Sequence, residues 1–331
     1  MKKLNFVGVD VSAKTITMII DQQGKRTEPL DLPNDTRGHK KLIGMITKSR
    51  SHARVVLEAT GVYSLDLSLA LHRANRVEVM VANPRAINQF AEAYMRRSKT
   101  DFLDARILLE FAMRMDFKLW SPPERHIFDL RAISRRIEGM IKTATQEKNR
   151  LHAADHFDEM TDVVRADIED NLEQLKNRIV RLRSQALELI DEHPDLARSF
   201  GHITSVKGIA EAAGIQILAE LSVLPSDMDV RQWVAHAGID PRQFQSGTSV
   251  NKPARISRRG NAHLRKALFM PALVAVQSEP HVKAFYDKLV ARGKTKMQAN
   301  VAVMRKLLHA IYGMLKHDQD FDGEKFYMLG T

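Results

Sequence analysis

Residues 4–11 read Leu-Asn-Phe-Val-Gly-Val-Asp-Val, and residues 15–21 read Thr-Ile-Thr-Met-Ile-Ile-Asp. Both segments are short, apolar and rich in β-branched side chains, which is typical of strands. The connection between them is short, and Gln-Gln-Gly-Lys at 22–25 turns the chain into a third extended stretch at 27–32. The start of the chain therefore predicts an antiparallel meander of three strands.

After the meander, helix and strand patterns alternate. Helical patterns occur near 37–48 and 64–74, strand patterns at 53–58 and 76–81, and two more helical patterns begin near Pro84 and Asp101. Strands that are apolar throughout are typical of the covered centre of a sheet. Residues 1–122 are therefore predicted to form an α/β domain with a mixed sheet and helices on both of its sides.

The composition points to a polyanionic partner. Of the 331 residues, 51 are Lys or Arg and 40 are Asp or Glu, so the formal net charge is +11. Such an excess favours binding to nucleic acid. The chain has no cysteine, which excludes disulfides, thiolate metal sites and a cysteine nucleophile. No signal pattern opens the chain and no apolar run approaches about 18 residues, so we expect a soluble cytoplasmic protein.

Residues 123–193 lose the strand pattern and have two long helical patterns with heptad spacing. With a turn near 156–161, they predict an antiparallel coiled-coil hairpin. Its many outer Arg and Lys residues either contact nucleic acid or another protomer, or form a solvated charged face. The two seams are Leu130, Ile133, Ile137, Met140, Ala144 and Leu151, interrupted by Glu147, and Ile168, Leu172, Leu175, Ile179, Leu182, Ala186 and Leu189.

Residues 194–331 are predicted to be mostly helical, ending in an amphipathic packing helix between Met297 and Leu315. Residues 203–210, Ile-Thr-Ser-Val-Lys-Gly-Ile-Ala, predict a helix, a tight glycine turn and a second helix. Helix-hairpin-helix elements of this kind present backbone amides to phosphates, which makes Lys207 and Gly208 candidate nucleic-acid contacts. A plain helical connector explains the same residues.

Four carboxylates are the candidates for chemistry: Asp10, Glu58, Asp101 and Asp104. Asp10 interrupts an apolar strand, where a buried carboxylate requires a cationic partner or a metal. Glu58 ends a central strand, at the edge where α/β sheets place ligands. Asp101 and Asp104 are three residues apart at the start of a helix and share one face of it. Their order along the chain favours one acidic site.

Each carboxylate also has a structural explanation. Ser98 and Asp101 are spaced as a capping box, and Asp104 is favourable near the positive end of the helix dipole. Glu58 could be an exposed residue at a strand end. Asp10 could pair with Lys14 in the following turn.

The order of the four acids resembles the RNase H-like fold of RuvC-type resolvases. In those enzymes carboxylates hold two Mg²⁺ ions for phosphoryl transfer, and magnesium suits an all-oxygen ligand set. With the third region added, the chain resembles the DEDD transposases, the insertion sequence one-hundred-ten family, which is related to the Piv-type DNA invertases. The motifs that carry the resemblance are Gly8-Val-Asp-Val-Ser12, Glu58-Ala-Thr-Gly61, Lys99-Thr-Asp-Phe-Leu-Asp-Ala105, Ile203-Thr-Ser-Val-Lys-Gly-Ile209, 233–247 and 256–268.

The resemblance implies a Mg²⁺-dependent DNA recombinase in three parts: a RuvC-like domain (1–122), the hairpin (123–193) and a transposase domain (194–331). It places Asp10, Glu58, Asp101 and Asp104 at the acidic positions and Ser246 at the nucleophile, with Ser249 as a neighbouring candidate. Taken alone, Ser246 in Gln-Ser-Gly-Thr-Ser is explained by turn chemistry. The residues implied to contact nucleic acid are Lys207, Gly208, Arg242, Arg255, Arg258, Arg259 and Arg265.

The resemblance also implies partners that composition does not reveal. These are donor and target DNA, a structured non-coding bridge RNA that pairs with both DNAs, and further copies of the chain in a dimer or tetramer. They imply a bacterial protein associated with the nucleoid. The chain departs from the family at Lys207-Gly-Ile-Ala210, where Pro-Gly-Ile-Gly is common.

Three other functions fit parts of the sequence. A junction-resolving nuclease would use the carboxylates without the serine. An actin-like sugar kinase also opens with a strand like Val7-Gly-Val-Asp10, but Ser12-Ala-Lys14 leaves little room for a phosphate loop. A non-catalytic nucleic-acid binder would need none of the four acids.

Overall fold

The chain divides into two compact units, Met1–Pro122 and Pro123–Thr331, in a computed structural model. The structure describes residues 3–59, 61, 63–94, 101–154, 162–246 and 250–329, with the backbone alone at 101, 243–246 and 250–254.

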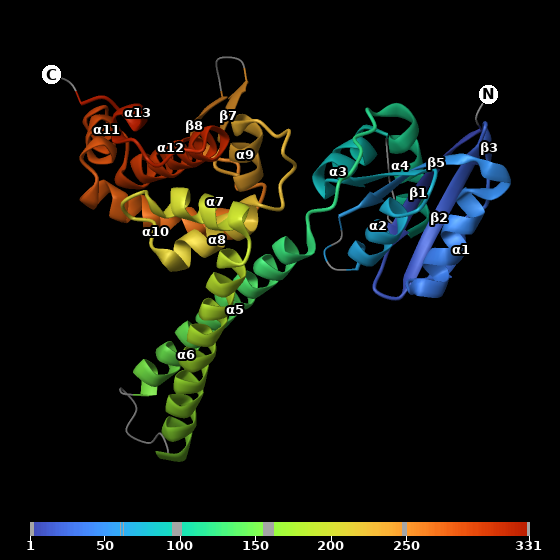
Figure 1. Ribbon diagram of the computed structural model, residues 1–331. Coiled ribbons are helices and arrows are strands. Elements are labelled where there is room, and N and C mark those ends of the chain that lie inside the picture. The colour runs from blue at the N-terminus through green and yellow to red at the C-terminus, as the bar shows by residue number, and fades with distance from the viewer. Residues whose placement is uncertain are drawn as a thin grey trace. The chain divides into compact units, whose positions relative to one another are not determined.

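The strands of the first unit are β1 (Leu4–Val11), β2 (Thr15–Gln22), β3 (Lys25–Arg26), β4 (Leu30–Pro33), β5 (His52–Glu58) and β6 (Val77–Ala82). They form the predicted mixed sheet, in the order β3-β2-β1-β5-β6 with β4 also paired to β2 (Figure 1). Pairing is antiparallel among β1 to β4 and parallel from β1 through β5 to β6. Of the third predicted strand, 27–32, only 30–32 is extended, as part of β4, while β3 begins within the predicted turn; Pro29 between the two strands cannot donate to a ladder.

The helices of the first unit are α1 (Thr36–Ile46), the 3-10 helix η1 (Lys48–Arg50), α2 (Leu65–His72), α3 (Pro84–Ala93) and α4 (Asp101–Arg114). Leu42 of α1 and Leu67 of α2 are buried in the core on one face of the sheet. Leu108 and Phe111 of α4 pack with Val56 on the other face, together with α3. Helices therefore lie on both sides of the sheet, as the sequence predicts.

Helix α4 makes an unusually close approach to β1. A Cβ atom at Gly8 would lie 2.2 Å from the carbonyl oxygen of Ala105 and 2.2 Å from the backbone nitrogen of Leu109. Only a residue without a side chain permits that approach. Ile19, the partner of Gly8 on β2, packs against the same two helix residues. The backbone of α4 therefore rests directly on the centre of the sheet.

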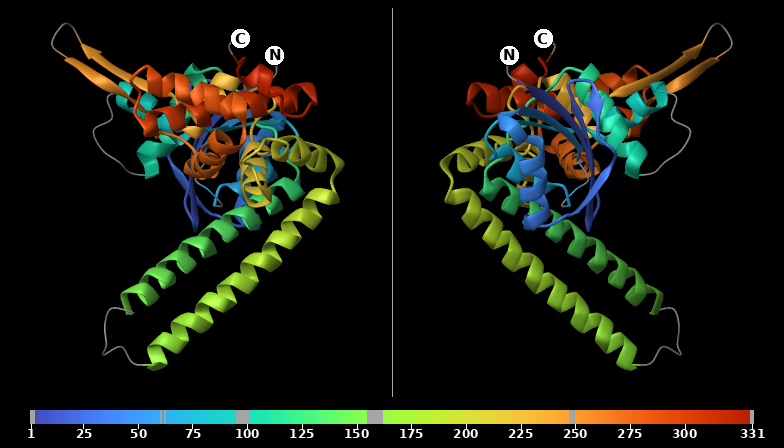
Figure 2. Two further views of the ribbon diagram at one scale, coloured as in Figure 1. Left: turned by 90° about the vertical axis from the view of Figure 1, so that its left-hand side faces the viewer. Right: turned by 90° about the vertical axis from the view of Figure 1, so that its right-hand side faces the viewer.

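Two 30-residue helices, α5 (Arg125–Ala154) and α6 (Asp162–Asp191), run side by side in the second unit (Figures 1 and 2). Ile137 and Met140 of α5 and Leu175 of α6 are buried. Glu147, which interrupts the first seam, is also buried and accepts a 2.7 Å bond from Arg150. The turn predicted near 156–161 lies outside the described residues.

The other helices of the second unit are α7 (Pro194–Thr204), α8 (Glu211–Leu221), α9 (Val230–Ala237), α10 (Ala262–Ser278), α11 (Pro280–Ala291), α12 (Lys296–His317) and α13 (Gly323–Phe326). The predicted helix-turn-helix corresponds to α7 and α8, and the predicted packing helix to α12. Ile217, Leu268 and Leu307, from α8, α10 and α12, are fully buried in one core. Within the described residues, none of the helices has the length and apolar character that a membrane crossing requires.

The second unit also contains a β-hairpin that the sequence analysis does not predict. Strands β7 (Pro241–Ser246) and β8 (Val250–Ile256) pair antiparallel and project from the helices of their unit (Figure 2). Their residues are mostly polar and do not alternate with apolar ones, so the usual strand pattern is missing. Backbone pairing holds the hairpin without an apolar face of its own.

A buried carboxylate joins α5 to the core of the second unit. Glu220 of α8 is 2% exposed and accepts bonds of 2.7 and 3.0 Å from Arg135, with Arg131 3.4 Å away. Asn261, the N-cap of α10, donates a third bond of 2.6 Å. Burial alone would raise the pKa of Glu220, but the bonds from Arg135 and Asn261 and the charge of the two arginines hold it below its ordinary value.

We predict that Gly8→Ala destabilises the first unit by about 1–3 kcal/mol, because the added methyl group must push α4 away from β1. Urea denaturation in a Trp233→Phe background measures this, since Trp120 then reports on the first unit alone. Gly44→Ala is the matched control. Gly44 is exposed on α1 with no atom within 4 Å of an added Cβ, so alanine should raise stability by about 0.5–1 kcal/mol. Equal effects of the two changes would contradict the close approach.

We predict that Glu220→Gln destabilises the second unit by about 1–3 kcal/mol at pH 7, because it removes the buried negative charge that two half-buried arginines pair with. The folded pKa of Glu220 is lowered, so its contribution is complete above the unfolded value, near about 4.3, and is lost as the pH falls through the folded value. The difference between wild type and variant should therefore shrink below about pH 4.

Urea unfolding followed by Trp233 fluorescence in a Trp120→Phe background tests this prediction. Glu192→Gln, a change at an exposed residue just after α6, should leave the urea midpoint of unfolding nearly unchanged both at pH 7 and below about pH 4. A pH-independent difference for Glu220→Gln would rule out the ionised carboxylate as the source of the stability.

Candidate active site

A transverse row of polar residues crosses the sheet of the first unit. Asp10 of β1 pairs with Thr17 of β2, which pairs in turn with Asp31 of β4. On the other side of β1, Val9 pairs with Leu57 of β5, so the next residues along, Asp10 and Glu58, are neighbours at the carboxyl ends of two parallel strands. Cross-strand partners point to the same face. The structure therefore brings two of the predicted acids together.

The row faces α4. Asp10 is two residues after Gly8 and thus on the side of β1 that α4 covers. Likewise, Glu58 is two residues after Val56, which packs with Leu108 of α4. The acids therefore lie on the covered face of the sheet at its carboxyl edge, where an open α/β sheet places its ligands.

Helix α4 runs antiparallel to β1. Ala105 lies over Gly8, near the middle of the strand. Further along the helix, buried Glu110 forms a 2.7 Å ion pair with Arg26 of β3, a strand that pairs with the part of β2 opposite the start of β1. The N-terminal turn of α4 must therefore lie towards the end of β1.

This direction brings the third and fourth predicted acids to the same edge. Asp104 is one turn before Leu108 and is half-buried. Asp101 is the first residue of α4. Its side chain, like Ser98 of the alternative capping box, lies outside what the structure describes. The backbone nevertheless places all four acids at one edge.

The edge is not a closed metal cage. Among the described side chains, no three acidic or histidine residues are close enough together to hold a metal ion. Asp10, Glu58 and Asp104 each have an interaction partner in the chain. The predicted ligands at this edge are carboxylates, and oxygen donors of this kind fit a hard divalent cation.

Asn34, which the sequence analysis missed, fixes the loops beside this edge. Its Nδ2 donates to the carbonyl oxygens of Ser12 (2.9 Å) and Tyr63 (3.0 Å), and its Oδ1 lies 2.9 Å from Nε2 of His39. The first loop follows β1 and the second follows β5. Burial lowers the pKa of His39 despite nearby Asp66 and Asp35, so its ring is neutral near pH 7. Only the position of Asn34 after a strand hinted at this role.

The predicted nucleophile belongs to the second unit. Ser246 ends β7 and pairs with Val250 of β8, so its backbone stands beside the tip of the hairpin. Its side chain and the whole of Ser249 lie outside the described parts of the chain. Arg242 pairs with Arg255 near the base of the same hairpin.

Lys207 and Gly208 lie in the turn between α7 and α8. Lys207 is exposed and its Nζ lies 3.4 Å from a carboxylate oxygen of Glu279. Gly208 has a φ of +113°, and a Cβ there would meet the backbone nitrogen of Ala275 at 2.7 Å. Packing against α10 therefore already requires this glycine, whatever its part in phosphate binding.

Arg258, Arg259 and Arg265 surround the C-terminus of α9. Arg265 donates to the carbonyl oxygen of Ala237 (2.8 Å), while Arg259 is exposed. Burial, together with the positive charge of Arg258, lowers the pKa of Arg265. The predicted cations thus gather around one loop, where they repel one another.

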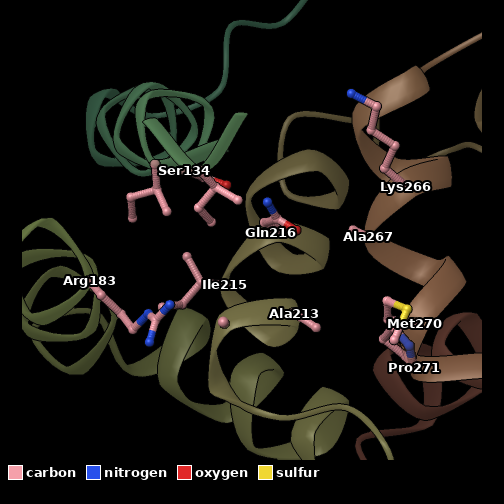
Figure 3. Close-up of a pocket in the computed structure, with 12 residues that line it drawn as sticks. Ser134, Arg183, Ala213, Ile215, Gln216, Lys266, Ala267, Met270 and Pro271 are labelled. Atoms are coloured by element: carbon pink, nitrogen blue, oxygen red, sulfur yellow. The ribbon is translucent and has the colours of Figure 1, made fainter. Parts of the chain in front are cut away.

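A small hollow of about 220 Å³ lies between α5, α6, α8 and α10 (Figure 3). Its lining is mainly apolar, with Ile215, Ala267 and Met270 among its residues. Arg183 and Lys266 also line it. No acidic side chain is part of this lining, and the hollow has no group of residues suited to acid–base chemistry.

Two family matches cover most of the chain. Residues 7–159 match a family described as "Transposase", and residues 201–287 match the "Transposase IS116/IS110/IS902 family". The first match contains the carboxylate edge, and the second contains the hairpin and the basic loop.

Full-length relatives agree with these matches. The chain is 27% identical to the pilin gene-inverting protein of Moraxella bovis over 96% of its own length and 97% of the relative. It is 29% identical to the pilin gene-inverting protein of Moraxella lacunata, over 82% and 83%. A 43.6 kDa protein of insertion element IS110 from Streptomyces coelicolor is 26% identical over 47% of this chain and 37% of that protein. Because relatives and family matches span both units in the same order, the chain belongs to the IS110 family of transposases, which are DNA recombination enzymes.

Proposed function

We propose that this protein cuts DNA strands and joins them to new partners, with the carboxylate edge of the first unit as its catalytic centre. The observation that carries the proposal is the convergence of Asp10, Glu58 and the first turn of α4 at one edge of the sheet. Four acids from three separate chain segments gather there, which a structural role for each acid alone does not explain.

The arrangement of strands in the first unit supports the proposal that it has an RNase H-like fold of the RuvC type. It joins an antiparallel meander to two parallel strands, with an acid near the end of its first strand. Helix α4 packs on that strand and runs antiparallel to it, so Asp101 and Asp104 in its first turn lie at the same edge. The domain proposed is residues 1–122.

Two Mg²⁺ ions would be held by the four carboxylates Asp10, Glu58, Asp101 and Asp104. When bound, the metal supplies positive charge to a scissile phosphate and to the oxygens that attack and leave it. The residues of this chain orient the site. Asn34 holds the loops that follow β1 and β5, and Gly8 lets α4 bring its two acids to the strands.

Ser246 is the proposed nucleophile. Its oxygen forms a bond to phosphorus while the bond from phosphorus to one deoxyribose oxygen breaks, and that oxygen leaves as a hydroxyl group after taking up a proton. The serine-linked phosphodiester keeps the energy of the broken bond. Attack by the hydroxyl of a second DNA strand then frees the serine and completes the exchange.

The basic residues of the second unit support binding to the nucleic-acid backbone. Arg242 and Arg255 stand on the hairpin that carries Ser246, and Arg258, Arg259 and Arg265 follow it. Cations near a reacting phosphate stabilise the charge that develops on it. Lys207 and Gly208 add backbone contacts at the turn between α7 and α8.

Assembly and guidance by RNA extend the same proposal. The heptad seams and side-by-side course of α5 and α6 support an antiparallel coiled-coil hairpin (123–193), followed by a transposase domain (194–331). Ile141, Val164 and Val180 on its helices are exposed, which favours association into a dimer or tetramer. The net charge of +11 suits the donor and target DNA and a bridge RNA that would select them.

We predict that Asp10→Asn and Ser246→Ala each reduce recombination by at least about a thousandfold, because the first removes a metal ligand and the second removes the attacking oxygen. The assay joins labelled donor and target DNA in Mg²⁺, with the RNA that co-purifies from cells carrying the flanking DNA. Asp116→Asn and Ser226→Ala, at exposed residues outside the site, should retain wild-type rates.

The DNA products separate this proposal from a junction-resolving nuclease. Denaturing gels should show DNA linked covalently to the wild-type protein and to none of the Ser246→Ala protein. If Ser246→Ala recombines normally, or if only Asp10 matters and free nicks appear, the serine mechanism is wrong. If both variants recombine DNA at the wild-type rate, neither residue is catalytic and the protein is a non-catalytic nucleic-acid binder.

A further inference from the structure

The second unit contains an open groove of about 790 Å³, whose lining includes three of the arginines named above together with cations and apolar residues not yet given a role. It lies between the base of the β7–β8 hairpin, the loop that follows β8, and helices α10 to α12. Its lining includes six cationic side chains and no acidic one: Arg255, Arg258, Arg265, Lys266, Lys294 and Arg305.

Most of this positive charge is uncompensated. Lys266 pairs with Glu138 at 2.9 Å, outside the lining. In the part of the chain that the structure describes, Arg255, Arg258, Lys294 and Arg305 have no ion pair. Cations that share a concave, partly apolar site raise its potential and attract a polyanion. The groove therefore suits phosphates.

The floor of the groove is apolar, which a purely phosphate-binding surface would not need. Phe269, Val301 and Met304 contribute to it, and Met297 also lines it while 59% exposed. Exposed Met297 and half-buried Phe269 offer contacts to the flat faces of nucleobases, which are hidden in a duplex and accessible in an unpaired strand. Phosphate-binding and base-binding surfaces thus lie side by side.

The loop at one wall is held firmly. Arg258 has a φ of +51°, in the left-handed region, and its backbone nitrogen donates to the carbonyl oxygen of Gly238 (3.0 Å). Gly260 lies so close to His236 that a Cβ would be 2.2 Å from its carbonyl oxygen. The hydroxyl of Ser257 donates a hydrogen bond to the carboxylate of Asp240. The position of Arg258 is therefore set before any ligand arrives.

We propose that this groove binds one or two unpaired nucleotides of a DNA strand, with phosphates on its cations and bases on its apolar floor. Its volume lies in the range of small-molecule sites, about 300–1,000 Å³, which gives room for one or two unstacked nucleotides. The assignment to DNA rests on the proposed function.

The groove is separate from the proposed nucleophile. Pro241 and Ile256 line it at the base of the hairpin, and Ser246 is five residues further along β7, about 17 Å away along the strand. A strand in the groove therefore does not reach Ser246. Loss of the groove should weaken strand binding without removing the chemistry.

Fluorescence anisotropy with a labelled 12-nucleotide single-stranded DNA, without Mg²⁺, tests the proposal on the full chain. The variant Lys294→Gln/Arg305→Gln should bind about tenfold more weakly, and the slope of log affinity against log salt should become shallower by about 1.4. Arg292→Gln/Lys316→Gln removes the same charge from the ends of α11 and α12 outside the lining, and should leave binding by this strand nearly unchanged.

An abasic strand of equal length tests the base contacts. Wild-type protein should bind it about tenfold more weakly than normal DNA, and Met297→Ser should reduce that difference. The proposal is overturned if the groove variant binds single-stranded DNA as tightly as wild type does, or if its affinity for duplex DNA falls by the same factor. It is also overturned if RNA of the same sequence binds wild type more tightly than DNA and it is RNA binding that the groove variant loses.

Failure of the groove and failure of the proposed function are distinguishable. Asp116→Asn protein should bind the single strand as wild type does, since Asp116 is an exposed residue of the first unit outside the proposed site. If wild type recombines DNA while the groove variant binds strands normally, the groove assignment alone is wrong. If strand binding behaves as expected but Asp10 and Ser246 have no effect on recombination, the catalytic proposal alone is wrong.

Discussion

The contact between α4 and β1 at Gly8 is the constraint on which the first unit depends. With any side chain at residue 8, the backbone of α4 could not lie within reach of the sheet, because Ala105 and Leu109 occupy the space. The helix is further held by buried Glu110, whose bonds from Arg114 and Arg26 outweigh its burial and lower its pKa. These contacts fix the distance of α4 from the sheet and the direction of its axis, and so they determine where its acidic first turn lies.

In the second unit, an ionic contact has the corresponding role. Glu220 ties α5 to α8 through Arg135 and to the start of α10 through Asn261. Asn261 follows the loop that carries Arg258, so the same network that anchors the long helices also positions one wall of the basic groove. Nearby His236 has its pKa lowered by burial, which avoids a further charge in the network. Residues that stabilise the unit therefore also position the groove that we propose as a binding site.

The sequence was sufficient for the elements that have a strong periodic pattern. Asp10 and Glu58 could be proposed as site residues because each interrupts or ends an apolar strand, and the strand register makes them neighbours. Asn34 and Glu220 could not be identified in this way, because their roles depend on partners that are distant in the chain. The β7–β8 hairpin was missed because its polar strands lack an apolar face, and backbone pairing leaves little trace in side-chain order.

The central claim is that Asp10, Glu58 and the start of α4 form one divalent-metal site. Fe²⁺ with ascorbate and peroxide, in place of Mg²⁺, cuts a polypeptide close to the bound ion. Peptide mapping of the wild-type chain should find cuts near residues 10, 58 and 101–104, suppressed by excess Mg²⁺ and lost in Asp10→Asn. Cuts confined to segments distant from residues 10, 58 and 101–104 would show that the ion binds elsewhere.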